Sequence, residues 1–476
     1  MSTTTQASQR IAALLDENSF VEIGANVTAR ATDFNLKQTE TPSDGVITGY
    51  GVIDGKLVYV YSQDSSVLGG SVGEMHAKKI TNLYDLAMKT GAPVIGLIDS
   101  AGLRLQEATD ALNGFGEIYN RQTMASGVIP QITAVFGACG GGLAVIPGLT
   151  DFTFMESEKG KMFVNSPNAL DGNEISRCDT SDAAFQSEET GMADVVADEA
   201  TVLSKIRELV SLLPSNCDMD DSYIECTDDL NRVCGDLAGC VSEGALAAAQ
   251  IADNNDFFET KAGFAKDMVT GFMRLNGATV GVVANRSKIY DEEGNVKEDL
   301  GSVMSADGCE KAADFVNFCD AFEIPVLTLT NVTGFKATKC NEKRMAKAVA
   351  KLTYAFANAT VPKVNVILGK AFGSAYVAMN SKALGADMTF AWNDAAIGMM
   401  DAKLAAKIIC DGKGADAIDA CAKDYAALQN DVMSAAGRGY VDTVINPADT
   451  RKYVIGAFEM LNTKCEDRPA KKHGTV

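Results

Sequence analysis

Histidine is almost absent from this chain of 476 residues, which contains only His76 and His473. Serine–histidine or cysteine–histidine catalysis needs a histidine at each site. Two sites of that kind cannot be built here, because His473 lies in the polar C-terminal tail. We interpret His76, near the start of a predicted helix, as a surface or capping residue rather than a base.

Recognisable metal and nucleotide motifs are also missing. The twelve cysteines show no C-x-x-C pair and no zinc-ligand spacing, which indicates reduced thiols and no metal. There is no Walker loop, and Gly140-Gly141-Gly142 lacks the spacing of the dinucleotide fingerprint. The net charge of −21 disfavours nucleic acid or anionic lipid as a direct partner.

No segment of the sequence is expected to enter a membrane. The stretch from Met1 to Gln6 has neither the basic nor the apolar region of a signal peptide. Met124 to Thr150 carries no charge and is long enough to span a bilayer, but its glycines and prolines would leave backbone groups unpaired in lipid. We therefore predict a buried strand, a glycine turn and a helix there, in a cytoplasmic protein.

The chain does contain an internal sequence repeat. Ala92–Leu103 and Ile324–Phe335 match, with Gly102 and Gly334 at an offset of 334 − 102 = 232 residues. The same offset relates three further pairs: Pro130 with Pro362, Gly137 with Gly369, and Gly141 with Gly373. A constant offset through separate motifs indicates one α/β fold, duplicated.

Each half follows the same predicted course. A β-hairpin turns at Asp54-Gly55 in the first half and at Asn276-Gly277 in the second, pairs that favour the positive φ angles of two-residue turns. A helix follows, and then two apolar strands that each end in a glycine turn. We expect a surface linker over Pro214–Asp229 and a polar loop over Lys288–Leu300.

The glycine turns are the candidate functional elements. In the first half Gly102-Leu103 and Gly141-Gly142 can face each other, and in the second half Gly334-Phe335 and Gly373–Ala375. Two converging backbone amides form an oxyanion hole, which a helix N-terminus strengthens. A single glycine turn more often serves close packing, but the paired arrangement, repeated at a fixed offset, favours a binding site.

These residues resemble a known family. Asp99–Arg104 followed by Gly140–Gly142 is similar to the crotonase superfamily, whose oxyanion hole stabilises the enolate of an acyl-CoA thioester. The chain from about Ala12 to Leu461 resembles the carboxyltransferase subunits of biotin-dependent acyl-CoA carboxylases and decarboxylases, of the propionyl-CoA carboxylase β and methylmalonyl-CoA decarboxylase α type. The matching segments include Asp44–Gly51, Gly69–Ile80, Ala262–Phe272 and Tyr354–Val364.

The resemblance implies two tandem crotonase (ClpP/crotonase-like) ββα spiral domains. Residues 1–232 would form the N-terminal, acyl-CoA side and residues 233–476 the C-terminal, biotin side. It further implies a homohexamer, a trimer of head-to-tail dimers, that moves a carboxyl group between an acyl-CoA, most simply methylmalonyl-CoA or propionyl-CoA, and biotin. The biotin would sit on a separate carrier protein, the biotin carboxyl carrier protein. Biotin carboxylase or membrane decarboxylase subunits would complete the complex, the latter placing it beside a membrane.

The resemblance also assigns roles to the turns. The backbone amides of Gly141 and Gly142 would hold the thioester oxygen. Those of Ser374 and Ala375 would hold the ureido oxygen of biotin. The flanking residues would bind acyl-CoA (Gly102, Leu103, Gly140) and biotin (Gly334, Phe335, Gly373). Departures from the family pattern at Leu103, Ser374 and Val377 leave the acyl chain open.

Two alternative functions remain from the sequence. A stand-alone enoyl-CoA hydratase or isomerase would need acid–base carboxylates beside the first hole, where Glu107 is the only obvious candidate. A non-catalytic assembly subunit would explain the altered turns.

Overall fold

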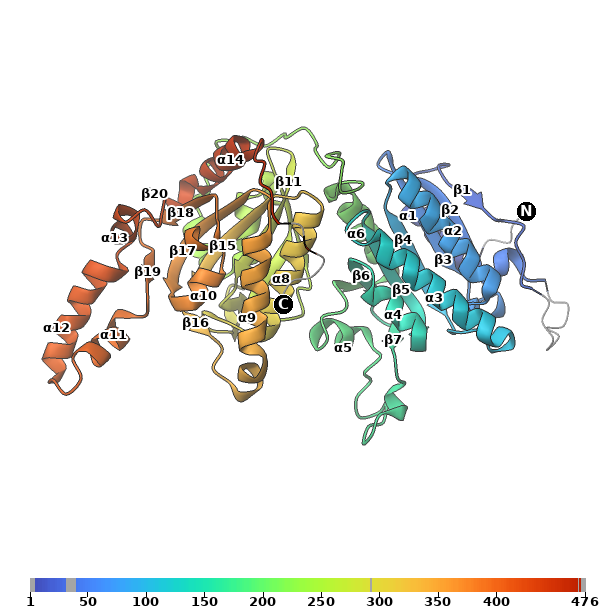
Figure 1. The fold of residues 1–476 in the computed structure, drawn as a ribbon, viewed down its shortest axis with the longest axis horizontal. Coiled ribbons are helices and arrows are strands. Elements are labelled where there is room, and N and C mark those ends of the chain that lie inside the picture. The colour runs from blue at the N-terminus through green and yellow to red at the C-terminus, as the bar shows by residue number, and fades with distance from the viewer. Residues whose placement is uncertain (1–4, 31–39, 292, 470, 472–476) are drawn as a thin grey trace. The chain divides into compact units, whose positions relative to one another are not determined.

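The computed structural model describes residues 5–30, 40–291, 293–469 and 471 (Figure 1). It consists of two compact units, Met1–Ser222 and Tyr223–Val476. The division falls inside the predicted linker, 232 − 222 = 10 residues before the domain boundary that we predict from the sequence. No described helix combines the length and the apolar character needed to span a bilayer.

The first unit is built on one sheet with the strand order β1-β2-β3-β4-β5-β6-β8, and β7 pairs with the end of β5. Its strands are β1 (Val21–Ile23), β2 (Val46–Ile53), β3 (Lys56–Gln63), β4 (Val94–Ser100), β5 (Gln131–Gly140), β6 (Phe152–Glu156), β7 (Lys161–Phe163) and β8 (Val195–Ala197). Its helices are α1 (Gln6–Leu14), α2 (Glu74–Thr90), α3 (Ala108–Ala125), α4 (Val145–Gly148), α5 (Ala183–Glu188) and α6 (Glu199–Leu212). The long helices α2 and α3 lie side by side against the sheet (Figure 1).

The second unit repeats this plan with the order β9-β10-β11-β15-β17-β18-β20, and β19 pairs with the end of β17. Its strands are β9 (Phe257–Thr260), β10 (Met268–Leu275), β11 (Ala278–Asn285), β12 (Lys288–Tyr290), β13 (Val296–Asp299), β14 (Val303–Met304), β15 (Val326–Val332), β16 (Gly334–Phe335), β17 (Lys363–Phe372), β18 (Met388–Trp392), β19 (Ala396–Gly398) and β20 (Thr443–Ile445). Its helices are α7 (Gly244–Ile251), α8 (Ala306–Ala321), α9 (Lys339–Asn358), α10 (Gly373–Ala378), α11 (Ala402–Ile409), α12 (Ala415–Tyr425), α13 (Val432–Gly437) and α14 (Thr450–Leu461).

The strand orders confirm the predicted duplication of an α/β fold. In both sheets the first strands pair in antiparallel fashion and the later ones in parallel. The hairpin turns have the expected positive φ angles, +48° and +82° at Asp54-Gly55 and +51° and +80° at Asn276-Gly277. Each unit encloses its own apolar core.

Two local predictions have different outcomes. The uncharged stretch Met124–Thr150 contains strand β5, a glycine turn and helix α4, as predicted. The expectation of a polar loop over Lys288–Leu300 is wrong, because β12 and β13 form a hairpin there that pairs Lys288 with Asp299. The carboxylate of Asp291 accepts the amide of Asn295 at 2.8 Å and closes the turn, so polar side chains rather than apolar alternation shape this hairpin.

A buried lysine fastens a helix to the hairpin in each unit. Lys79 of α2 donates to the carbonyl oxygen of Val46 at 2.5 Å. Lys311 of α8, at the offset 311 − 79 = 232, donates to the carbonyl oxygen of Met268 at 2.8 Å. Both carbonyls open the second strand of their sheet, so the duplication extends to this interaction. Burial lowers the pKa of Lys79 to about 8 and that of Lys311 to about 7.

His76 is fully buried, so its predicted position at the surface is wrong. Its Nδ1 donates to the carbonyl oxygen of Asp44 at 2.9 Å, and its Nε2 accepts from the amide of Gln63 at 3.2 Å. Burial, together with the nearby Arg104 guanidinium, lowers the pKa of His76 from 6.5 to about 3. The ring is therefore neutral at pH 7 and both nitrogens have structural partners.

This burial predicts a pH-dependent loss of stability. Below pH 6.5 His76 becomes protonated in the unfolded chain but stays neutral in the folded chain. The free energy of unfolding therefore decreases as the pH is lowered. Glutamine does not titrate, so His76→Gln lacks this pH dependence. We expect the free energy of unfolding of the unaltered protein, relative to that of His76→Gln, to be about 1.4 kcal/mol lower at about pH 5.5 than at about pH 7.5. Urea unfolding of both proteins at the two pH values measures it. A difference that does not vary with pH would contradict the neutral, buried ring.

Candidate active site

The candidate turns follow strands that end together. In the first unit β4 and β5 run parallel and their last pair is Ser100 with Cys139. In the second unit β15 and β17 end with Val332 and Ala371, at the offsets 332 − 100 = 232 and 371 − 139 = 232. Because the carboxyl ends of neighbouring parallel strands meet at one edge of a sheet, the turns that follow are brought close together.

A bulge just before each strand end is fixed in the same way. The register shifts between Ile98 and Ser100 in one unit and at the equivalent place in the other. The bulged residues are Asp99 and Asn331. Their backbone amides donate to the side-chain carbonyl oxygens of Gln63 at 3.3 Å and Asn285 at 3.0 Å. A side-chain amide at the end of the hairpin therefore sets where each turn begins.

The second turn of each unit leaves backbone amides without partners from the helix. Gly141, with φ +64°, opens a 3-10 helix that leads into α4, and Gly373, with φ +63°, opens α10. The first amides of a helix have no intrahelical acceptor, and no side chain caps either helix. Gly142 and Ser374 are exposed, whereas Ala375 is buried. Such a turn presents amides to an anion or a polarised oxygen.

Within each unit the two turns touch. A Cβ on Gly102 would lie 3.5 Å from the carbonyl oxygen of Gly140, which places Gly102 and Leu103 beside the glycine run. In the second unit β16 packs against α10, so Gly334 and Phe335 lie beside the start of that helix. The structure thus brings together the predicted residues of the first turn pair, and separately those of the second.

The turns at Gly102-Leu103 and Gly334-Phe335 are also bonded to the residues just before helices α2 and α8. The amide of Val72 donates to the carbonyl oxygen of Gly102 at 2.8 Å, and that of Arg104 to Val72 at 3.0 Å. The second unit repeats the latter bond between the amide of Lys336 and the carbonyl oxygen of Met304 at 2.9 Å. Short parallel bridges therefore hold both turns in place.

A buried ionic cluster holds the Gly102-Leu103 turn of the first unit. The Arg104 guanidinium donates to Asp44 at 2.6 Å and to Glu107 at 2.8 Å, and all three side chains are buried. The second carboxylate oxygen of Glu107 accepts the amide of Glu74 at 2.5 Å. Burial raises the pKa of Asp44 although Arg104 opposes the shift. Glu107 is thus fully occupied by structural partners, which removes the acid–base candidate of a hydratase.

Tyr119 is a residue of the site that the sequence did not reveal. It projects from α3, stacks on Phe115 with ring centroids 6.0 Å apart, and donates from its hydroxyl to the carbonyl oxygen of Gly142. Burial raises its pKa, so the phenol keeps its proton. Nothing in the sequence around Tyr119 distinguishes it from other helical aromatics, and only the fold brings it to the turn.

Gly140 packs closely against a neighbouring ring. A Cβ at this position would lie 2.7 Å from the ring of Phe163 in β7, closer than real contacts allow. A larger residue at position 140 would therefore need the ring of Phe163 to move. Leu103 is half-buried and Val377 is exposed, so both border the open side of their turns.

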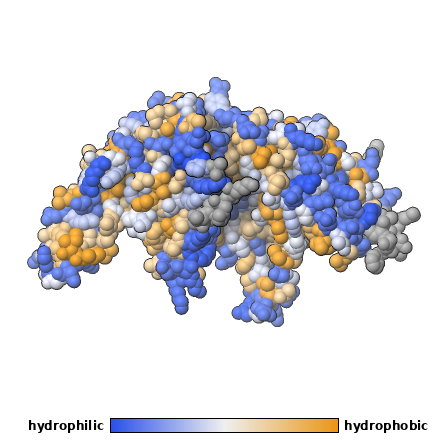
Figure 2. All heavy atoms as spheres, viewed as in Figure 1, coloured by the Kyte–Doolittle hydropathy of each residue, from blue (hydrophilic) through white to orange (hydrophobic). Residues whose placement is uncertain are grey.

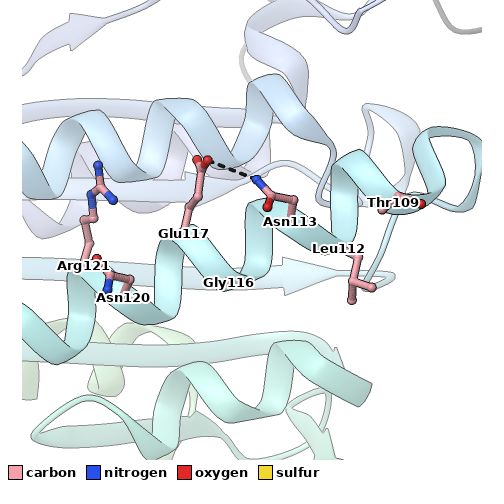
Figure 3. A pocket seen from close by; sticks show the side chains of 7 residues that line it. All are labelled: Thr109, Leu112, Asn113, Gly116, Glu117, Asn120 and Arg121. Atoms are coloured by element: carbon pink, nitrogen blue, oxygen red, sulfur yellow. Dashed lines mark hydrogen bonds between the residues drawn. The ribbon is translucent and has the colours of Figure 1, made fainter.

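A separate depression of about 490 Å³ runs along the outer face of α3 (Figure 3). None of the predicted site residues lines it, so it is not the candidate active site. Its lining comes from one helix: Thr109, Leu112, Asn113, Gly116, Glu117, Asn120 and Arg121. Across the residues that the structure describes, no group of three histidine, cysteine or carboxylate side chains could hold a metal ion.

Known proteins resemble this chain over nearly its full length. The methylmalonyl-CoA decarboxylase subunit alpha of Propionigenium modestum is 40% identical over 99% of this chain and 92% of its own length. The propionyl-CoA carboxylase beta chain of Roseobacter denitrificans is 42% identical over 99% of this chain and 93% of its own.

A solved structure supports the same grouping and the crotonase-like fold. The transcarboxylase 12S crystal structure, described as a hexamer with methylmalonyl-coenzyme A and methylmalonic acid bound, superposes with a TM-score of 0.92 at 36% identity. The match covers 98% of this chain and 92% of that one. The family model of the carboxyl transferase domain matches residues 4–476. The chain therefore belongs to the carboxyl transferase domain family.

Proposed function

We propose that this protein is the carboxyltransferase subunit of a biotin-dependent decarboxylase or carboxylase. It moves a carboxyl group between an acyl-CoA, methylmalonyl-CoA or propionyl-CoA, and biotin on a separate carrier protein. The observation that carries the proposal is the repeated pair of uncapped turn amides, at Gly141-Gly142 and at Ser374-Ala375. Neither turn offers an ionisable side chain as a base.

The two turns fit two oxygens that gain charge during transfer. On the acyl-CoA side, the amides of Gly141 and Gly142 would hold the thioester oxygen as enolate charge develops on it. A Cβ at Gly141 would meet no atom within 4 Å, so the approach to this backbone is open. Tyr119 would hold the peptide group between Gly142 and Leu143, directly after these amides, by its hydrogen bond to the carbonyl oxygen of Gly142.

On the second side, the amides of Ser374 and Ala375 would hold the ureido oxygen of biotin, with Gly334, Phe335 and Gly373 around the ring. Biotin supplies a ureido group that accepts the carboxyl on nitrogen and charge on oxygen. Gly334 also has open space, since a Cβ there would meet no atom within 4 Å. Because each oxyanion-hole donor is worth about 3 kcal/mol in transition-state binding, a duplicated hole suits a reaction in which two oxygens change charge.

The assembly follows from the relatives rather than from a single subunit. We propose a homohexamer, a trimer of head-to-tail dimers, with active sites between the acyl-CoA side of one subunit (about residues 1–232) and the biotin side of another (233–476). A biotin carrier and either a biotin carboxylase or a membrane decarboxylase subunit would set the direction of transfer. In the decarboxylase version the enzyme would lie in the cytoplasm beside the membrane, held there by its partner subunit.

Gly141→Pro tests the first hole. Proline cannot adopt the φ of +64° found at Gly141 and has no amide hydrogen, so we expect carboxyl transfer from methylmalonyl-CoA to free biotin to fall by at least about 100-fold. The measurement is the biotin-dependent formation of propionyl-CoA. Gly412→Pro is a matched control, because Gly412 has a φ of +78° in the exposed loop between α11 and α12.

Light scattering should give the same oligomer for both proline variants and for the unaltered protein. A transfer rate for Gly141→Pro equal to that of the unaltered protein would rule out the first hole.

Leu103→Ala tests whether Leu103 contacts the acyl group of the substrate. Removing the half-buried side chain of Leu103 should admit a longer acyl chain, and one methylene in such a pocket changes selectivity by about 10-fold. We expect kcat/KM for ethylmalonyl-CoA, relative to methylmalonyl-CoA, to rise by about that factor, while the KM for free biotin stays unchanged. An unchanged preference would show that Leu103 does not contact the acyl group.

A further inference from the structure

Basic side chains gather on one helix of this acidic protein. The chain carries a net charge of −21, yet residues 336–351, which leave β16 and continue into α9, hold one acidic residue, Glu342, and six basic ones. These are Lys336, Lys339, Lys343, Arg344, Lys347 and Lys351. We call the exposed residues Lys336, Lys339 and Lys343 the basic face. Figure 2 shows the end of α9 near β16 as a hydrophilic projection.

The basic face is not explained by ion pairs within the subunit. The neighbouring Arg344 pairs with Asp307 and Glu310, and Lys351 with Glu310. Among the described residues, no carboxylate lies within ion-pair distance of the three lysines of the basic face. Lys339 also stands in the first turn of α9, where the helix dipole disfavours a cation. Neither ion pairing within the subunit nor the helix dipole therefore accounts for these charges.

The duplicated fold provides an internal comparison. Phe115, Ile118, Gln122 and Ala125 of α3 are buried, and so are Met345, Ala348, Leu352 and Ala355 of α9, with the same spacing. The helices therefore match at an offset of 345 − 115 = 230, two residues short of the offset of the strands. At this offset Lys339 and Lys343 take the places of Thr109 and Asn113, which line the uncharged end of the depression in Figure 3.

This divergence is confined to the half proposed to bind biotin. Both units share one architecture, so a charge present on only one copy of a helix points to a ligand that only that half meets. Lys336 directly follows Phe335, the proposed biotin-side turn, and Lys339 and Lys343 continue from it along one helix face at i, i+4 spacing.

We infer that the basic face binds an acidic surface of the biotin carrier protein beside its biotinylated lysine, an inference that rests on the proposed function. Attachment of biotin converts that lysine into a neutral amide, and a transferable carboxyl group adds a negative charge. Both changes favour a positive surface at the entrance. Because the enzyme as a whole is acidic, a local positive face offsets the long-range repulsion of an acidic partner and guides its approach.

The test compares the carrier with free biotin. In the triple variant Lys336→Glu, Lys339→Glu and Lys343→Glu, we expect the KM for the biotinylated carrier domain to rise by about tenfold at low salt. The KM for free biotin and the KM for methylmalonyl-CoA should not change. The loss should shrink at about 0.5 M salt, since screening weakens exposed charge pairs. A control variant with the same charge change at exposed lysines elsewhere is Lys159→Glu, Lys297→Glu and Lys413→Glu.

The outcomes separate the two levels of the proposal. No transfer to free biotin by the unaltered enzyme would overturn the proposed function itself. Transfer to free biotin with an unchanged KM for the carrier in the triple variant, or an equal rise in the control variant, would overturn the inference alone. A rise in the KM for methylmalonyl-CoA would overturn it in favour of CoA phosphates as the ligand of the basic face.

Discussion

The proposed site depends on two parallel strands that end side by side, followed by a helix start that no side chain caps. In each unit a bulged residue at the strand end, Asp99 or Asn331, is held by a side-chain amide from the neighbouring hairpin strand. That bond fixes where the following turn starts. The next strand is followed by a glycine with positive φ, which opens a helix that no side chain caps. In the proposed reaction, peptide groups alone stabilise the charge, so the chemistry does not depend on either of the two histidines.

Duplication supplies two such edges, and divergence makes them different. The strand orders, the strand-end bulges and the buried lysines Lys79 and Lys311 are common to both units. The ionic cluster around Arg104 is confined to the first turn, and Lys336 at the equivalent position is exposed. Buried ion pairs therefore reinforce the Gly102-Leu103 turn of the first unit, whereas the backbone bond between Lys336 and Met304 holds the Gly334-Phe335 turn of the second. This difference is compatible with the proposed acyl-CoA thioester at the first unit and a protein-borne biotin at the second.

Most of the fold could be predicted from the sequence, because glycine turns and apolar strands leave a periodic signal. The hairpin turns at Asp54-Gly55 and Asn276-Gly277 are examples. The burial of His76 could not be predicted, since it depends on Gln63 and Asp44, which only the tertiary fold brings to the ring. The hydrogen bond of Tyr119 was missed for the same reason. The two-residue shift between α3 and α9 could not be seen in the sequence, because the strands before and after these helices both match at an offset of 232 residues.

The most direct test is a structure of the enzyme with an acyl-CoA and a biotin derivative bound together. The account predicts the thioester oxygen about 2.7–3.1 Å from the amides of Gly141 and Gly142, and the ureido oxygen at a similar distance from those of Ser374 and Ala375. A thioester oxygen held instead by a side chain, with the Gly141 and Gly142 amides facing water, would contradict it.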